Sequence, residues 1–117
     1  MMPLYEILFY EKENGEEPAK VFIEGLPAKL KAKTLHDLNL LRAFGPNARL
    51  PLSRSLGDGI FELRTVFSSD ISRILYFFYE GQRIILTNGF IKKQQQTPHL
   101  QIDRARRYRA DFLDREV

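Results

Sequence analysis

Ile60-Phe-Glu-Leu-Arg-Thr-Val66, Ile71-Ser-Arg-Ile-Leu-Tyr-Phe-Phe-Tyr79 and Arg83-Ile-Ile-Leu-Thr-Asn-Gly-Phe-Ile91 are the stretches that decide the fold. Each is rich in β-branched and aromatic residues, which favour strands. The linkers between them, 67–70 and 80–82, are short enough to be tight turns. Such turns join antiparallel strands, whereas parallel strands need long crossovers. The sequence therefore predicts a meander of three consecutive, mutually paired antiparallel strands.

Upstream of this meander, the sequence predicts a further strand and, before it, two helices. Gly57-Asp58-Gly59 is a tight turn, and a short edge strand interrupted by Pro51 precedes it within Leu50–Leu56. Pro18 and Pro27 stand where proline favours the first turn of a helix.

The second helix has an apolar stripe that ends at Gly45-Pro46, where a helix cannot easily continue. Its apolar residues recur at helical spacing: Leu30, Leu35, Leu38, Leu41 and Phe44. We expect the first two helices to pack as a hairpin on one face of the sheet through Leu35, Leu38 and Leu41.

The two ends of the chain complete the expected architecture. Leu4–Tyr10 has the composition of a first strand. Thr97-Pro98 has a favoured capping residue followed by a favoured first residue, so a last helix should begin there and run to about Arg115. Its apolar side comprises Ile102, Ala105, Tyr108 and Phe112. The prediction is one α+β domain over 1–117: a two-helix hairpin and a C-terminal helix packed on a mostly antiparallel, twisted sheet of four to five strands.

The amino-acid composition limits which classes of protein fit this chain. The chain has 117 residues, 44% of them hydrophobic, which suits a single domain with a core of its own. It has no cysteine, so a disulfide scaffold, a thiolate metal site and a cysteine nucleophile are excluded. We find no signal peptide and no run of about 18 apolar residues. The expectation is a cytoplasmic protein without a membrane partner.

The charges are unevenly distributed, although the net charge is only +3. Residues 1–17 are mostly acidic, and residues 92–109 contain six lysines and arginines against Asp103 alone. Clustered cations suit a phosphate backbone, although an ordinary solvated helix face is the alternative explanation.

The residues that usually build hydrolase sites are missing. The only histidines are His36 and His99, and no His, Asp or Glu cluster has ligand spacing, so we expect no metal and no cofactor. What remains is a set of cations on or just after strands: Arg64, Arg73, Lys92 and Lys93. Adjacent antiparallel strands can bring Arg64 and Arg73 onto one surface, where several cations make an anion site. The alternative is that either arginine faces solvent or is paired, and Glu62 lies on the same strand face as Arg64.

Three segments together resemble the HigB-like branch of the RelE/ParE toxin superfamily, whose members are often described as phage-related. They are Glu62-Leu63-Arg64, Arg73-Ile74-Leu75-Tyr76 and Asn88-Gly-Phe-Ile-Lys-Lys-Gln-Gln-Gln-Thr-Pro98. The resemblance covers nearly the whole chain and implies a RelE-like fold. One departure concerns Gln96, which stands where many relatives have lysine.

The resemblance implies a type II toxin–antitoxin toxin that cleaves mRNA on the ribosome and is neutralised by a cognate antitoxin, a small helix-turn-helix protein. In that reaction the ribose 2′-OH attacks its own phosphate, so the protein must move protons and stabilise charge. Arg73 is expected to matter most, then Lys92 and Lys93, with Arg64 and His99 behind. The residues expected to contact RNA are Gln95, Arg106, Arg107 and Tyr76.

Two other functions fit the same residues. ParE relatives share the fold but poison DNA gyrase without cutting RNA, and the Lys92-Lys93 segment favours the nuclease over that activity. The absence of a lysine at Gln96 weakens that preference. The third possibility is a phage-derived relative that binds RNA or an antitoxin and cuts nothing.

Overall fold

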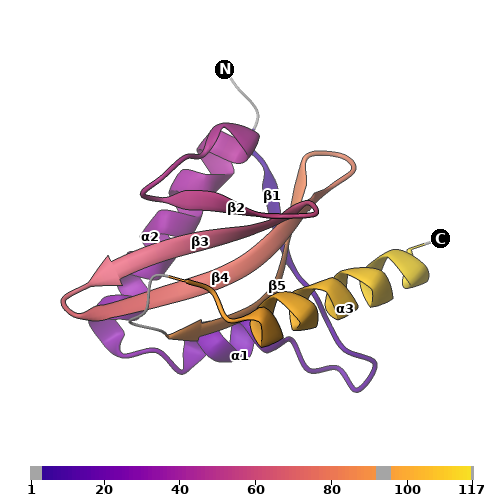
Figure 1. The fold of residues 1–117 in the computed structure, drawn as a ribbon, viewed down its shortest axis with the longest axis horizontal. Coiled ribbons are helices and arrows are strands. Elements are labelled where there is room, and N and C mark those ends of the chain that lie inside the picture. Colours follow the sequence, from indigo (N-terminus) through magenta and orange to yellow (C-terminus); the bar gives the residue numbers. More distant parts are fainter. Residues whose placement is uncertain (1–3, 92–95, 117) are drawn as a thin grey trace.

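The computed structural model describes residues 4–91 and 96–116, which form three helices packed on a five-stranded sheet (Figure 1). In chain order the elements are β1 Glu6–Phe9, α1 Pro18–Glu24, α2 Ala28–Phe44, β2 Ser53–Gly57, β3 Ile60–Phe67, β4 Asp70–Tyr79, β5 Arg83–Ile91 and α3 His99–Arg115, with a 3-10 turn at Gly45–Asn47. None of the helices in this part of the chain is long and apolar enough to cross a membrane.

The strands lie in the order β1-β5-β4-β3-β2. β3, β4 and β5 are consecutive, adjacent and antiparallel, which confirms the predicted meander. β2 pairs antiparallel with β3 at one edge, while β1 pairs parallel with β5 at the other. The turn between β2 and β3 places Asp58 and Gly59 at φ angles of 56° and 75°, as a primed hairpin turn requires. The predicted α+β fold with a mostly antiparallel sheet is confirmed.

Helices cover both faces of the sheet, with α1 and α2 on one face and α3 on the other (Figure 1). The first core contains Ala19, Ile23, Leu38, Leu41, Leu63, Ile74, Tyr76, Ile84 and Leu86. The second contains Tyr10, Ile60, Leu75, Phe77, Ile85 and Ala105. Because β4 is buried on both sides, its sequence is almost continuously apolar rather than alternating.

The apolar stripe predicted on α2 is only partly correct. Leu38 and Leu41 are buried as expected, but Leu35 is 45% exposed and takes no part in the core. The inward positions beside Leu38 belong to Thr34 and Asp37, which bond to Ser72 and Thr65 on the sheet. Since each helical residue turns about 100° from the last, a face defined by these polar contacts points Leu35 outward.

Phe44, the last residue of the predicted stripe, is also exposed, at 50%. α1 and α2 each pack on the sheet, α1 against β5 and α2 against β3. The hairpin expected between them is therefore held together chiefly by the sheet beneath both helices.

The last helix begins one residue later than predicted. Pro98 occupies the capping position, no side chain caps the helix, and the first helical residue is His99. Thr97 was expected to cap, but its hydroxyl donates to the Glu62 carboxylate instead. The predicted apolar side of α3 is confirmed, because Ala105 is buried and both Tyr108 and Phe112 pack against the second core.

Candidate functional site

A buried carboxylate on β3 binds cations from the two strands beside it, β2 and β4. Glu62 on β3 accepts a hydrogen bond from Arg54 Nε on β2 at 2.8 Å and from Arg73 Nη1 on β4 at 3.2 Å. Thr97, just before α3, donates its hydroxyl to Glu62 Oε1 at 2.5 Å. The Glu62 and Arg73 side chains have no exposed area, whereas 30% of the Arg54 side chain is exposed. We call Arg54, Glu62, Arg73 and Thr97 the Glu62 cluster.

Strand register explains why these residues meet. Arg54 stands directly opposite Glu62, and Leu75 stands opposite Glu62 on the other side. Arg73 is two residues from Leu75 and so projects from the same face, the one that α3 partly covers. An unpaired carboxylate there would be very costly, and the two guanidinium groups with one hydroxyl satisfy it.

Arg64 adds a further cation to this face. It stands directly opposite Arg73 in the register of the structure, on the one surface that these two arginines were expected to share. Its Nε is buried without a hydrogen-bond partner, and no acidic side chain among residues 4–91 and 96–116 pairs with it. Like charges directly opposite each other destabilise a sheet. The stability of the fold therefore does not explain why an arginine stands at position 64.

The cluster and Arg64 together carry a surplus of positive charge. Arg54 and Arg73 bond to Glu62, and Arg64 stands opposite Arg73, so these four side chains carry three positive charges and one negative charge, a net charge of about +2. In a partly desolvated site such a surplus attracts an anion strongly. Arginine forks suit phosphate in particular, because they can hold two of its oxygens at once.

The remaining residues predicted to be catalytic lie next to this cluster along the chain. His99 is exposed on the first turn of α3, two residues after Thr97. Lys92, Lys93 and Gln95 lie outside the described residues, between the end of β5 at Ile91 and the start of the Thr97 contact. Gln96 is exposed.

Tyr76 does not fit its predicted role as an RNA contact. It lies on the opposite face of the sheet, is only 1% exposed and belongs to the core under α1 and α2. Its hydroxyl bonds to that of Ser53, and burial raises the pKa of Tyr76 to about 12. A stacking residue must offer a ring face to solvent, so the expectation for Tyr76 was wrong.

Arg106 and Arg107 lie along α3, on its solvent side. Arg106 pairs with Asp58 in the β2–β3 turn and with Asp103, both at 3.3 Å. Arg107 is exposed, and none of the ion pairs given for the described residues includes it. Of these two predicted RNA contacts, Arg107 has the freer guanidinium group.

Sequence reasoning missed Arg54 and the central position of Glu62. Arg54 sits in a short strand that reads Ser-Arg-Ser-Leu-Gly, where a lone cation is an ordinary edge residue. A signal existed in the Glu62-Leu63-Arg64 motif, since a carboxylate in a strand covered on both faces requires partners. Only the register assigns them as Arg54 and Arg73.

The described residues contain no group of three His, Cys, Asp or Glu side chains placed to hold a metal ion. The guanidinium groups of Arg54, Arg64 and Arg73 suit the binding and polarisation of an anion. The Glu62 cluster can hold the start of α3 through Thr97, which couples the segment before that helix to the charged cluster.

Comparison with known proteins identifies a family but no individual relative. No curated protein matches the chain. The family model described as "Phage derived protein Gp49-like (DUF891)" matches residues 21–110. This range begins within α1, contains α2, the strands β2 to β5 and the whole Glu62 cluster, and ends within α3. Because the match covers well over half of the sequence, this chain belongs to the Gp49-like family of phage-derived proteins.

Proposed function

We propose that this protein is the toxin of a type II toxin–antitoxin pair and that it cleaves mRNA on the ribosome without a metal ion. The observation that carries the proposal is the surplus of guanidinium groups around Glu62. Membership of the Gp49-like phage-derived family and the resemblance of the strand and lysine segments to HigB-like toxins support it.

The proposed chemistry needs charge stabilisation more than a protein nucleophile. The 2′-OH of a ribose attacks the adjacent phosphate, and the P–O5′ bond breaks as a 2′,3′-cyclic phosphate forms. Arg54, whose side chain reaches solvent, and Arg64 would hold the phosphate oxygens as negative charge grows on them. Arg73 would act indirectly, by holding the Glu62 carboxylate in position. Lys92, Lys93 and His99 are the candidates for proton transfer.

The proposed partners are mRNA, the ribosome and a cognate antitoxin, expected to be a small helix-turn-helix protein. A cationic site favours a partner with an acidic segment, because complementary charges steer association and fix its register.

A second candidate function has its own supporting observation. Arg73, the residue expected to be the most important for cleavage, is fully buried and ion-paired with Glu62. Such a pair can be purely structural, and Gln96 replaces a cation at the edge of the site. Both facts favour a relative that binds RNA or an antitoxin and cuts nothing.

One experiment separates these functions. The purified protein is added to ribosomes programmed with a defined mRNA, and cuts are mapped by primer extension under single-turnover conditions. Cuts in codon register support the proposal, and Arg54→Ala should slow them on the order of 10²-fold, the usual effect of losing one charge-stabilising donor. Lys29→Ala, an exposed cation on α2, is the matched control.

Two results would contradict the nuclease proposal. Intact mRNA with folded protein favours the binding relative. Growth arrest with DNA-damage signalling and inhibited gyrase, again without cuts, identifies a ParE-like poison.

A further inference from the structure

We propose that the outer edge of β2 and the pocket beside it bind an extended, acidic segment of a partner polypeptide, which adds to the sheet as a further strand. β2 is the last strand in the sheet order, so no described strand covers its outer side. The identification of this partner as the antitoxin rests on the function proposed above, whereas the binding mode does not.

The backbone of β2 presents unused hydrogen-bonding groups at this edge. The Arg64 N–H donates to the Leu52 carbonyl at 2.8 Å, so every second residue from Leu52 bonds to β3. The intervening residues, Ser53 and Ser55, therefore turn their backbone groups outward. The Ser53 N–H is taken up by the Arg49 carbonyl. The Ser53 carbonyl and both backbone groups of Ser55 remain to pair with an incoming strand.

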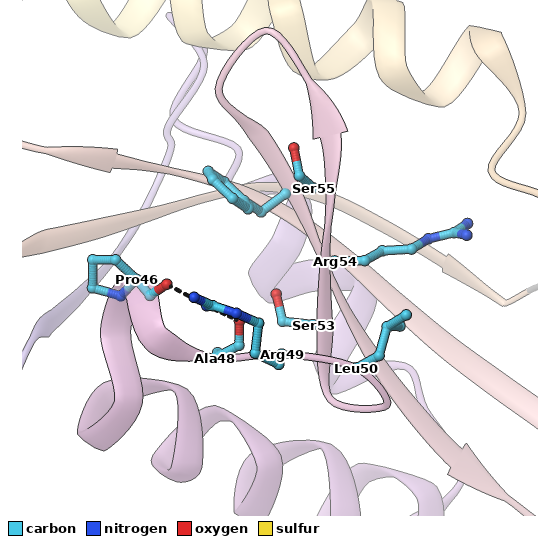
Figure 2. Close-up of a pocket in the computed structure, with 8 residues that line it drawn as sticks. Pro46, Ala48, Arg49, Leu50, Ser53, Arg54 and Ser55 are labelled. Atoms are coloured by element: carbon cyan, nitrogen blue, oxygen red, sulfur yellow. Dashed lines mark hydrogen bonds between the residues drawn. The ribbon is translucent and has the colours of Figure 1, made fainter.

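A pocket of about 510 Å³ lies against this edge (Figure 2). Its lining is mostly apolar and includes Pro46, Ala48, Leu50 and Phe61. Leu50 is 62% exposed, although it is a large apolar side chain beside a strand edge. In strand addition, main-chain bonds supply affinity and a pocket accepts alternate side chains of the added segment. The added strand should therefore carry an apolar side chain facing this pocket.

The charged residues beside the pocket indicate which other side chains the added strand should have. Among the described residues that line the pocket, the charged ones are Arg49 and Arg54. Arg49 donates to the carbonyl oxygens of Pro46 at 2.9 Å and Ala48 at 3.2 Å, which leaves its charge uncompensated (Figure 2). Arg54 extends away from the other pocket residues towards the Glu62 cluster. A strand with acidic residues would neutralise Arg49, as electrostatic complementarity favours.

The same charges disfavour a second copy of this chain as the occupant. A two-fold interface uses the same patch on both subunits, so it would bring Arg49 and Arg54 of one copy against those of the other. A partner of opposite charge avoids that repulsion. Because Arg54 belongs both to this edge and to the Glu62 cluster, the occupant would lie directly beside the candidate site.

The test begins with a displayed library of random octapeptides selected on the full-length protein. We expect the enriched peptides to alternate apolar with acidic residues. A synthetic peptide from that pool should slow the amide hydrogen exchange of Ser55. Ser55→Pro removes the outward N–H without touching the β3 ladder, as edge strands tolerate, and should weaken binding about tenfold, the effect of one lost hydrogen bond.

A charge reversal supplies the matched comparison. Arg49→Glu should also weaken binding about tenfold, whereas Lys29→Glu, a reversal on exposed α2, should leave it unchanged. The inference is overturned if no acidic consensus emerges, if the peptide binds Ser55→Pro as tightly as the unaltered protein, or if the edge is instead occupied by a second copy in solution. None of these readouts involves ribosomes, so loss of the nuclease proposal and loss of this one are distinguishable.

Discussion

At the scale of single residues, the decisive one is Glu62. Its fully buried carboxylate, on β3, bonds to Arg54 on β2, to Arg73 on β4 and to Thr97 before α3, and so holds these side chains in position. Such clusters contribute little net stability compared with apolar packing, but they are costly to break because the remaining charge is left without its partner. The cluster is therefore better explained by the arrangement it imposes than by the stability it adds.

Arg73 offers the sharpest test of that arrangement. Arg73→Ala should abolish cleavage and lower the free energy of unfolding by up to about 3–5 kcal/mol, the range for breaking a buried ion pair. Arg73→Lys keeps the charge but not the fork, so it should recover only part of the activity. Single-turnover cleavage on programmed ribosomes, with thermal melting alongside, measures both effects.

A paired replacement separates folding from activity. Glu62→Leu combined with Arg73→Met removes both charges and should be nearly neutral in stability, yet inactive. If this double variant cuts mRNA at the rate of the unaltered protein, the Glu62 cluster is not part of the site.

A change at Tyr76 should affect stability but not activity. Tyr76→Phe removes the hydroxyl that bonds to Ser53 and should cost about 0.5–1.5 kcal/mol of stability. Because the ring is in the core under α1 and α2, RNA affinity and cleavage rate should not change. Urea unfolding and RNA-binding titrations measure the two quantities. A clear loss of RNA affinity in the folded variant would restore Tyr76 as a contact.

At the scale of elements, the close approach of α1 to β5 depends on a missing side chain. A Cβ on Gly89 would overlap the ring of Phe22 on α1. Gly89→Ala should therefore destabilise the protein by about 1–3 kcal/mol, as overpacking of a core does. Gly25→Ala is the control, since its added Cβ would meet only ordinary contacts, the nearest at 3.5 Å. Equal melting temperatures for the two variants would contradict this account of the packing.

Two carboxylates help to hold α3 against the rest of the molecule. Asp58 in the β2–β3 turn bonds to Arg109 of α3, and Asp111 of α3 bonds to Tyr10. The Arg109 guanidinium group holds the pKa of Asp58 below its usual value, and the Tyr10 hydroxyl does the same for Asp111. A carboxyl group whose pKa is lower in the folded protein stabilises the fold above its ordinary pKa. That stabilisation is lost as the pH falls through the lowered value.

This attachment predicts a loosening of α3 in acid. Below about pH 4, amide hydrogen exchange in α3 should accelerate before exchange in β4 does. A double variant, Asp58→Asn with Asp111→Asn, should show faster exchange at neutral pH and a weaker pH dependence. An unchanged acid profile in that variant would show that other groups hold the helix.

At the scale of the whole molecule, charge and fold predict how the activity responds to metal removal. If cleavage depends on guanidinium groups, a chelator specific for transition metals should leave its rate on programmed ribosomes unchanged, with magnesium kept because ribosomes need it. Loss of cutting that zinc or manganese restores would count decisively against the proposed chemistry.

Most helices and strands of this protein could be predicted from local sequence patterns. β-rich runs separated by short turns were enough for the β3–β4–β5 meander, because side-chain preference and turn length act locally. The placement of Arg64 and Arg73 on one surface was also foreseeable from adjacent antiparallel strands, but their direct opposition came from the register in the structure.

Tertiary structure alone decided which of these residues meet. Thr97 has the chemistry of a helix cap, but the buried Glu62 carboxylate takes its hydroxyl instead. Leu35 follows the leucine spacing, yet Thr34 and Asp37 face the sheet in its place because they have hydrogen-bond partners there. Arg54 joins the site only through the pairing of β2 with β3. In each case a long-range polar contact outweighed a local preference, because an unsatisfied buried polar group costs more than a cap or one apolar contact gains.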